Sequence, residues 1–397
     1  MARGRGGFIG QDGLNAPDSP TGVSATAGDA QASVAFTAPT DVGGSAITGF
    51  RAQSNPSGIG VSGSSSPITV TGLSNGTAYT FNVWAINAFG YSAPSDASGS
   101  VTPSDPFGGV TGYFFGGNNS GYKNVIQFTA IATLGNSTDF GDLTTVLTRM
   151  GACSSSTRGV VTGGYNALGA TAQNTIQYIT LNSLGNTTDF GDLLAINRFN
   201  SSCSNSTRGC TGGGQSGGGA TYDTIQYVTI ASTGNATDFG DLTVARWGTG
   251  ACGSTTRGIF AAGIGSTVTI DYITIGSTGN ATDFGDLTVA SYGPGGHSNS
   301  TRGIFAGGDR NNVIDYITIA STGNATDFGD LSYTASAGVA AAASSTRGLI
   351  FSGSNSYGKM DYITIASTGN SQEFGDLLAD GGRDHGAAVS DGHGGLS

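Results

Sequence analysis

The chain is poor in charged residues, histidine, cysteine and tryptophan. Only 10% of its 397 residues are Asp, Glu, Lys or Arg, where ordinary domains have about 25%, and it contains 3 His, 4 Cys and 2 Trp. No apolar stretch is long enough to predict a membrane span or a secretory signal. The net charge is −11, which argues against a nucleic-acid partner because phosphate contacts require Lys and Arg.

The sequence also lacks a recognisable catalytic constellation. Its histidines, His297, His385 and His393, lie in no nucleophile or metal-binding motif. The glycine-rich stretch 212–219 lacks the strand–GxxxxGK(S/T)–helix context of a phosphate loop. Carboxylates recur in register with a repeat, so no single acid–base pair for glycoside cleavage stands out. We therefore expect no enzyme activity and no cofactor.

Glycine is abundant, with 70 residues, and much of it lies in register with one repeated motif. The motif reads (S/T)xGNxTDFGDL with small variations. Its acidic position falls at Asp139, Asp189, Asp238, Asp283, Asp327 and Glu373, a period of 44 to 50 residues. Such a period is too long for one coil of a β-helix and suits the four-stranded blade of a β-propeller. Six copies predict six blades that close into a ring.

Each repeat contains four short runs with the composition of β-strands. In one repeat these runs are 250–254, 259–262, 269–277 and 283–287. The third run is rich in Ile, Thr and Tyr, which fit a pleated, half-buried surface. Gly279 and Asn280 tolerate a positive φ and are expected to turn the chain. Phe284 and Leu287 are expected to anchor the outer strand on the neighbouring blade. The predicted fold class is all-β.

These features resemble the kelch-type propeller. The resemblance lies in glycine pairs after the second strand, a Tyr in the third and an Arg before the inner strand: Gly116-Gly117, Gly163-Gly164, Gly212-Gly213 and Gly307-Gly308; Tyr178, Tyr227, Tyr272, Tyr316 and Tyr362; Arg149, Arg198 and Arg246. The chain departs from the family in carrying Phe where the outer strand usually has Trp, and in the pairs Ala262-Gly263 and Ser352-Gly353. The resemblance runs from residue 107 to the C terminus and implies a six-bladed kelch-like β-propeller.

The two ends of the repeat region complement one another. Residues 112–117 match the second strand of other repeats, with no first strand ahead of them, whereas residues 383–390 match an inner strand with no blade after it. A C-terminal strand that completes the first blade would protect both sheet edges. We therefore expect the strand at 383–390 to pair with Tyr113–Gly116.

Residues 17–103 make a second module ahead of the repeats. Short runs of alternating character recur between turn signals, over about the length of one β-sandwich domain. The stretch 70–83 (VTGLSNGTAYTFNV) resembles the tyrosine corner of a fibronectin type III domain, with Leu73 and Tyr79 in matching places. Phe36 and Phe50 stand where that family usually has Trp and Tyr. The resemblance implies an N-terminal fibronectin type III-like β-sandwich.

The first ten residues differ from the acidic remainder of the chain. They are basic and glycine-rich, and Arg3 and Arg5 are followed by Phe8 and Ile9. They are either a disordered terminus or a docking arm that orders on a larger acidic partner. The predicted organisation is an arm at residues 1–16, a sandwich at 17–103, a linker at 104–106 and a propeller at 107–397.

One register of successive inner strands carries small or metal-ligating side chains. Its members are Cys153, Cys203, Cys252, His297, Ala342 and, for the sixth strand, Ala388. These residues are either zinc ligands at the axis or side chains that pack where inner strands crowd. Ligands on different blades are too far apart for Zn–S bonds of about 2.3 Å, so we expect packing and no metal.

A second register places basic residues at one turn. Its members are Arg158, Arg208, Arg257, Arg302 and Arg347, with His393 in the sixth place. The arginines either form an anion-binding ring or pair with carboxylates of the motif. Those carboxylates are Asp142, Asp192, Asp241, Asp286, Asp330 and Asp376. Because each motif copy supplies its own carboxylate, we expect the structural pairing.

The longest departures from the repeat are the loops 165–173 and 215–223. Extra loop length in a compact ring is more often functional than core-building, although plain loop drift is the alternative. Tyr165 and Tyr222 offer aromatic faces for stacking on a sugar or a protein surface. We therefore name these two tyrosines as candidate partner-binding residues, together with Arg3, Arg5, Phe8 and Ile9.

The glycine-, serine- and asparagine-rich style and the module order resemble structural proteins of tailed phages, especially those infecting marine cyanobacteria. The resemblance implies a virion protein that assembles in the host cytoplasm without a secretion signal. It implies a non-enzymatic surface or appendage protein whose arm contacts other virion proteins. The propeller would then serve as decoration or attach to a host-surface glycan or protein. The alternatives are a glycan-binding tail-fibre adhesin and a glycan-cleaving depolymerase.

Overall fold

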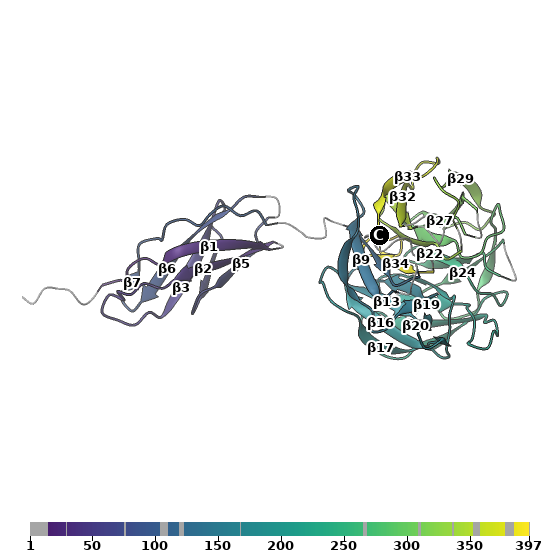
Figure 1. The fold of residues 1–397 in the computed structure, drawn as a ribbon, viewed down its shortest axis with the longest axis horizontal. Helices are drawn as coiled ribbons and strands as arrows, with labels where there is room; N and C mark the ends of the chain where they lie inside the picture. The colour runs from purple at the N-terminus through teal and green to yellow at the C-terminus, as the bar shows by residue number, and fades with distance from the viewer. Residues whose placement is uncertain are drawn as a thin grey trace, which may run out of the picture. The chain divides into compact units, whose positions relative to one another are not determined.

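The computed structural model describes residues 15–28, 30–74, 77–103, 110–118, 123–166, 168–264, 268–308, 311–335, 337–351, 358–377 and 385–396. All regular elements in these ranges are β-strands, so the all-β prediction is confirmed. The chain divides into two compact units, Met1–Gly108 and Gly109–Ser397 (Figure 1).

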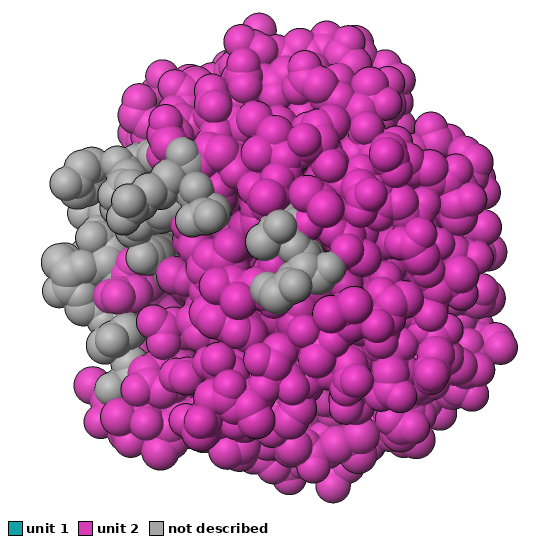
Figure 2. Space-filling model, turned by 90° about the vertical axis from the view of Figure 1, so that its right-hand side faces the viewer, with its two compact units in different colours: residues 1–108 teal, residues 109–397 magenta. Residues whose placement is uncertain are grey.

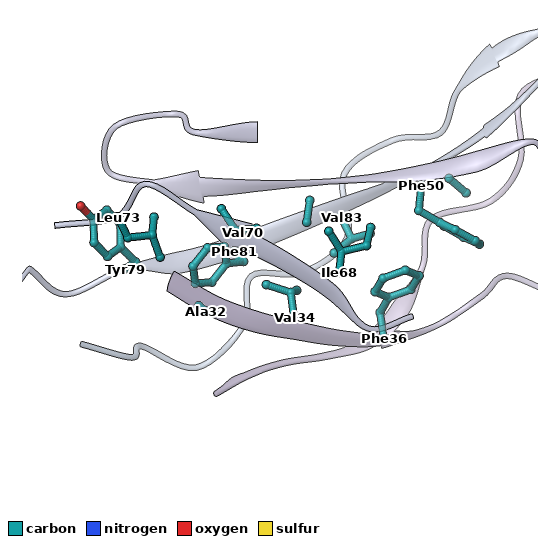
Figure 3. Close-up of a cluster of buried hydrophobic side chains, with 12 residues drawn as sticks. Ala32, Val34, Phe36, Phe50, Ile68, Val70, Leu73, Tyr79, Phe81 and Val83 are labelled. Carbon is teal, nitrogen blue, oxygen red and sulfur yellow. The ribbon is translucent and has the colours of Figure 1, made fainter. Parts of the chain in front are cut away.

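Unit 1 is a sandwich of two antiparallel sheets. One contains β1 (Thr21–Gly28), β2 (Gln31–Thr37) and β5 (Ile68–Thr71); the other contains β4 (Gly60–Gly63), β3 (Gly49–Asn55), β6 (Thr80–Asn87) and β7 (Gly90–Tyr91). Alternate residues of β2, β3 and β6 are buried, as expected when one face of each strand lies on a shared core. Phe36 and Phe50 lie side by side in that core, with ring centroids 4.8 Å apart (Figure 3).

The tyrosine corner of unit 1 is present as its sequence predicts. The Ser74 backbone N–H donates to the Tyr79 hydroxyl at 3.1 Å, and Leu73 is buried beside it. The edge of β6 is completed by serines instead of a regular strand. Ser92, Ser95 and Ser98 each accept a backbone N–H of β6 with the side-chain oxygen and donate their own backbone N–H back to β6. These pairs leave that edge of the strand satisfied.

Unit 2, drawn in magenta in Figure 2, contains six antiparallel sheets of four strands each. From the inner to the outer strand, the first three sheets are β34 (Ala387–Ser390), β8 (Thr111–Phe115), β9 (Val125–Ala130) and β10 (Thr138–Asp142); β12 (Gly151–Ser154), β13 (Arg158–Thr162), β16 (Thr175–Thr180) and β17 (Thr188–Asp192); β18 (Ser201–Ser204), β19 (Arg208–Gly212), β20 (Thr224–Thr229) and β21 (Thr237–Asp241). The other three are β22 (Gly250–Gly253), β23 (Arg257–Ala261), β24 (Thr269–Thr274) and β25 (Thr282–Asp286); β26 (Gly295–Ser298), β27 (Arg302–Ala306), β28 (Val313–Thr318) and β29 (Thr326–Asp330); β30 (Ala340–Ala343), β31 (Arg347–Phe351), β32 (Lys359–Thr364) and β33 (Gln372–Asp376).

The first of these sheets joins both ends of unit 2. The C-terminal strand β34 pairs with β8 in the register Ala388 to Phe114 and Val389 to Tyr113, so the predicted pairing of the chain ends is confirmed. The same register corrects two predictions. Val389, not Ala388, takes the place of Cys153, and Thr111, not His393, takes the place of the turn arginine. Counting along the sequence missed both because the sixth inner strand and its partner come from opposite ends of the chain.

The inner strands contact one another in the order β12, β18, β22, β26, β30 and β34, and β34 in turn contacts β12. The repeated motif links the same sheets at their outer strands. In each link the motif Asn of one sheet accepts, through Oδ1, the backbone N–H of the second motif Asp in the sheet before it, at 2.9–3.1 Å. The pairs are Asn186 with Asp142, Asn235 with Asp192, Asn280 with Asp241, Asn324 with Asp286, Asn370 with Asp330 and Asn136 with Asp376. The last pair returns from the sixth sheet to the first.

The turn arginines also bridge neighbouring sheets, but they do not pair with the motif carboxylates as predicted. Each guanidinium lies 4.2–4.6 Å from the ring centre of the third-strand Tyr and donates through Nη1 to a carbonyl of the next sheet. The carbonyls belong to Ile230 for Arg158, Ile275 for Arg208, Ile319 for Arg257, Ile365 for Arg302 and Ile131 for Arg347. Stacking on the tyrosine and the hydrogen bond to the backbone carbonyl hold the guanidinium away from the carboxylates of the motif.

The side chains of the Cys/His register pack between neighbouring sheets. The Sγ of Cys153 lies 2.5 Å from the point that a Cβ on Gly209 of the next sheet would occupy. Cys203, Cys252 and His297 lie in the same way over Gly258, Gly303 and Gly348. Burial raises the pKa of Cys153 to about 12, so the thiol stays protonated. Among the described residues no group of three or more His, Cys, Asp or Glu is placed to hold a metal.

Candidate functional site

Six residues, one before each inner strand, form a hydrogen-bonded ring around the axis of unit 2. We call it the axial ring; its members are Arg149, Phe199, Gly248, Gly293, Gly338 and His385. The backbone N–H of each donates to the carbonyl of the one before it, and Arg149 closes the circuit by donating to His385, at 2.7–3.0 Å throughout. All six have positive φ, between 56° and 81°. The left-handed conformation turns the chain sharply from one sheet into the next inner strand.

The six members of the axial ring share one backbone conformation, but only three of them are glycine. Its three glycines adopt positive φ at no steric cost, whereas the left-handed region costs other residues about 1–2 kcal/mol each. His385, Arg149 and Phe199 accept this cost and follow one another around the ring. Side chains therefore project from one half of the ring and are absent from the other. Strained non-glycine residues of this kind cluster at functional sites.

The side chains of that half gather with aromatic residues that precede the ring positions. Phe199 lies 4.6 Å from Trp247, 6.2 Å from Tyr292 and 5.5 Å from His385 between ring centres, and Trp247 and Tyr292 meet edge to face at 5.0 Å. All four side chains are half-buried. We call this group the mouth cluster. It presents aromatic edges and faces at one end of the axis.

Arg149 provides a positive charge beside the mouth cluster. Its guanidinium lies 4.6 Å from the ring centre of Phe199 and 5.3 Å from that of Tyr165. Nε is buried without a hydrogen-bond partner, and no carboxylate among the described residues forms an ion pair with the side chain. Arg198 lies on the same tyrosine at 5.3 Å, but its Nη2 donates to Gln215 Oε1 at 2.9 Å. Arg149 therefore keeps its hydrogen-bonding capacity for another group.

A cavity of about 100 Å³ lies within the axial ring. Arg149, Phe199, Tyr292 and His385 line it together with Asn200, Ser202 and Thr249, whose side-chain polar groups bond to other protein groups. Its described lining contains no Asp or Glu. A second cavity of about 50 Å³ lies between the inner strands further along the axis. The C-terminal turn contacts its wall, where His393 Nε2 donates to the Ser154 carbonyl at 3.1 Å and the Gly394 N–H donates to the Ser298 carbonyl at 2.9 Å.

The three arginines that resemble one kelch position occupy three different places. The carbonyls of Leu147, Asn197 and Arg246 each accept the N–H of a glycine that follows a second strand, so these three residues are equivalent in the repeat. Arg198 therefore falls one residue after this position, and Arg149 falls two residues after it. Arg246 is fully buried and pairs with Asp271 at 3.0 Å, the one ion pair found within the described residues. The shared position was wrong, because Arg149, Arg198 and Arg246 lie two, three and four residues before the first residue of β12, β18 and β22.

The sequence-predicted binding residues are placed unequally. Tyr165 starts β14 (Tyr165–Asn166), which joins β11 (Leu147–Thr148) and β15 (Thr171–Ala172) in a small sheet, and it stacks on Arg149 beside the cavity. Tyr222 is half-buried and lies outside the mouth cluster, with its N–H bonded to Gly214. Arg3, Arg5, Phe8 and Ile9 lie outside the described residues. So does Ser352-Gly353 of the kelch comparison.

Sequence reasoning missed Phe199, Trp247, Tyr292 and His385. The available signal was the position two residues before each inner strand, where three repeats have Gly and three do not. One of the chain's two tryptophans stands beside it. The described part of the chain contains no helix long and apolar enough to cross a membrane.

Comparison with known proteins identifies one of the two units. The fibronectin type III domain family matches residues 18–100, and no curated protein matches the chain. A solved structure, domains A168-A170 from titin, is 29% identical over 22% of this chain and 32% of that chain, with a TM-score of 0.22. The family match coincides with the two-sheet sandwich and its tyrosine corner. Residues 18–100 are therefore a fibronectin type III domain.

Proposed function

We propose that unit 2 is a six-bladed, kelch-like β-propeller closed by β34. Three cyclic series support this proposal: the inner-strand contacts, the Asn–Asp bonds of the motif and the backbone bonds of the axial ring. Each series has six members and returns from the last sheet to the first. The glycine pairs after the second strand, such as Gly163 and Gly164, have positive φ and meet the loop of the next sheet; in the third sheet the pair is Gly213-Gly214, one residue later than predicted. The chain would thus consist of an arm at residues 1–16, a sandwich at 17–103, a linker at 104–106 and a propeller at 107–397.

For this propeller we propose a non-enzymatic binding function at the axial ring. The observation that carries the proposal is the break in repeat symmetry at His385, Arg149 and Phe199. Residues placed in the left-handed region at an energetic cost, around a cavity with aromatic walls and a few polar groups, are typical of a ligand site.

The biological setting that we propose is the surface or an appendage of a virion. The resemblance in style and module order to tailed-phage structural proteins supports this setting. The fibronectin type III domain and the arm, through Arg3, Arg5, Phe8 and Ile9, would attach to other virion proteins. The propeller would be displayed for decoration or for attachment to a host-surface glycan or protein.

A glycan-cleaving depolymerase is the second candidate. Glycoside hydrolysis usually requires two carboxyl groups about 5–10 Å apart across the bond that is cleaved. The described lining of the axial cavity supplies none, and the motif carboxylates repeat around the outer strands. These observations favour binding without cleavage.

Binding can be tested with the purified chain on a glycan array, with release of new reducing ends followed in the same samples. We expect saturable binding without reducing-end release, and loss of binding in Trp247→Ala. Tyr222→Ala is the matched control, because Tyr222 is a half-buried tyrosine outside the mouth cluster. Reducing-end release would contradict the non-enzymatic assignment, and equal losses in the two variants would contradict the position of the site.

The virion setting needs a separate test. Deletion of residues 1–11 should leave both units folded but prevent the chain from co-sedimenting with assembled particles. Normal co-sedimentation of the deletion variant would contradict attachment through the arm.

A further inference from the structure

We propose that the axial cavity binds a sugar residue bearing a carboxylate, with Arg149 as the carboxylate ligand. This inference rests on the proposed binding function and names its ligand class. The two can fail separately, because a neutral glycan could bind to the same aromatic walls without using Arg149.

The first argument is the state of the guanidinium groups. Among the arginines described in unit 2, the five turn arginines donate to carbonyls, Arg246 pairs with Asp271 and Arg198 bonds to Gln215. The guanidinium of Arg149 alone forms no hydrogen bond or ion pair in the described structure, whereas Arg198 and Arg246 leave only part of theirs unpaired. A half-buried guanidinium with an unpaired Nε is stabilised by a planar anion, and a carboxylate can accept two of its N–H groups.

The second argument is the geometry of the aromatic walls. Phe199 and Tyr165 flank the guanidinium, while Tyr292 and Trp247 meet edge to face beyond Phe199. Of these rings, Phe199 and Tyr292 line the cavity itself. Aromatic rings next to one charged group match a ligand with an apolar face and a carboxylate on the same ring.

The third argument is size and preorganisation. A cavity of about 10–15 Å³ holds one water, so about 100 Å³ has room for a single sugar residue or its charged substituent, not for a folded peptide segment. The axial ring fixes the Arg149 backbone on both sides, with its N–H on His385 and its carbonyl on Phe199. The guanidinium itself lies against the Phe199 and Tyr165 rings, so it loses little freedom when the ligand binds.

Titration calorimetry of the full chain tests the ligand class. The probes are glucuronic acid and N-acetylneuraminic acid, their methyl esters, glucose and an acidic peptide of Asp and Glu. We expect one site for an acidic sugar, weaker binding at higher salt, and a loss of about 10- to 100-fold for its ester.

The decisive variant is Arg149→Gly, because glycine already occupies three of the six ring positions. It should lower affinity for the acidic sugar by about 10- to 100-fold and leave the melting temperature close to wild type. Lys359→Gln is the charge-matched control, because this exposed lysine on β32 lies away from the cavity, and it should bind as wild type does.

Equal binding of acid and ester, or full affinity in a folded Arg149→Gly variant, would overturn the carboxylate assignment. If those sugars still lose affinity in Trp247→Ala, the proposed binding function stands while this inference fails. Binding of the acidic peptide alone would overturn the sugar assignment. The absence of all glycan and protein binding would overturn both proposals.

Discussion

The outer strands and the axial ring of unit 2 are each joined by six hydrogen bonds that pass from sheet to sheet, yet only the outer strands carry a repeated sequence. At the outer strands the acceptor is an Asn side chain, so every copy needs the same residue. In the axial ring both donor and acceptor are backbone groups, so any residue that tolerates positive φ can stand there. Repetition thus marks positions whose side chains hold the sheets together, and variation marks positions whose side chains are available for binding.

The largest expected effect comes from breaking the inner strands and the axial ring together. Deletion of residues 385–397 removes β34 and one member of the axial ring. It leaves the edge of β8 that pairs with β34 without a partner strand. We expect loss of the folded, monomeric unit 2, because an uncovered sheet edge exposes backbone groups to other chains. Light scattering and circular-dichroism melting measure this outcome.

Unit 1 provides the control for that deletion. Trp84 lies in β6 and Trp247 lies in unit 2. In a Trp247→Phe background, tryptophan fluorescence therefore reports on the fibronectin type III domain alone. The domain should melt unchanged. A monomeric deletion variant whose unit 2 melts at the wild-type temperature would show that β34 is not needed for closure.

The next largest effect is expected at the one ion pair found within the described residues. Arg246 and Asp271 are both fully buried and 3.0 Å apart, and Asp271 also accepts the Thr243 N–H and hydroxyl. Arg246→Met leaves a buried carboxylate without its cation, which should cost about 3–5 kcal/mol in the free energy of unfolding. Urea denaturation measures it. The double variant Arg246→Met/Asp271→Asn should recover part of the loss, and no recovery would mean that packing, not charge, dominates.

Much of the fold could be predicted from the sequence because the repeat reports on the positions that build it. Strand order, outer anchors such as Phe284 and the pairing of the two chain ends follow from period and composition. The exact register at β34 does not, because it joins segments from opposite ends of the chain. The arginine stacking also escaped prediction, since a guanidinium can satisfy a carbonyl as well as a carboxylate. The site was missed except for Tyr165, because repeat reasoning searches for sameness and the axial ring is defined by difference.

A third effect depends on pH and tests one irregular member of a packed register. Burial lowers the pKa of His297 to about 3, and neither ring nitrogen has a hydrogen-bond partner. The unfolded chain takes up a proton near pH 6.5 while the folded chain does not, so stability falls as the pH drops from about 6.5 towards 3. His297→Cys places there the residue found at Cys153, Cys203 and Cys252.

Between pH 7 and pH 4 the free energy of unfolding of this variant should fall less than that of wild type, by on the order of 3 kcal/mol. Urea titrations at the two pH values give the difference. His385→Asn, which changes a half-buried histidine of the axial ring, is a control for general loss of histidine. An equal pH slope in wild type and His297→Cys would contradict the assignment.

A smaller and uniform effect is expected at the outer strands. Asn280→Ala removes the acceptor for the Asp241 N–H, and a lost hydrogen bond of this kind costs about 1 kcal/mol. Asn235→Ala should cost the same within error, because it removes the equivalent bond to Asp192. Chemical denaturation of both variants measures the symmetry directly, and costs that differ by more than about twofold would contradict an equivalent role for the motif copies.

The smallest effect on stability is expected where the proposed effect on binding is largest. Arg149→Gly relieves the left-handed strain of about 1–2 kcal/mol, but it gives up the stacking on Phe199 and Tyr165 and makes the unfolded chain more flexible. These terms oppose one another, so the free energy of unfolding should change by less than about 1 kcal/mol. Gly248→Ala is the reverse change, and it should destabilise clearly, because a Cβ there would overlap the Tyr292 ring at positive φ. Urea denaturation of the two variants measures the contribution of the axial ring to stability, and calorimetry with the acidic sugars measures its contribution to binding. If Arg149→Gly instead unfolds unit 2, the arginine is a structural member of the ring and the contrast between ring and outer strands does not hold.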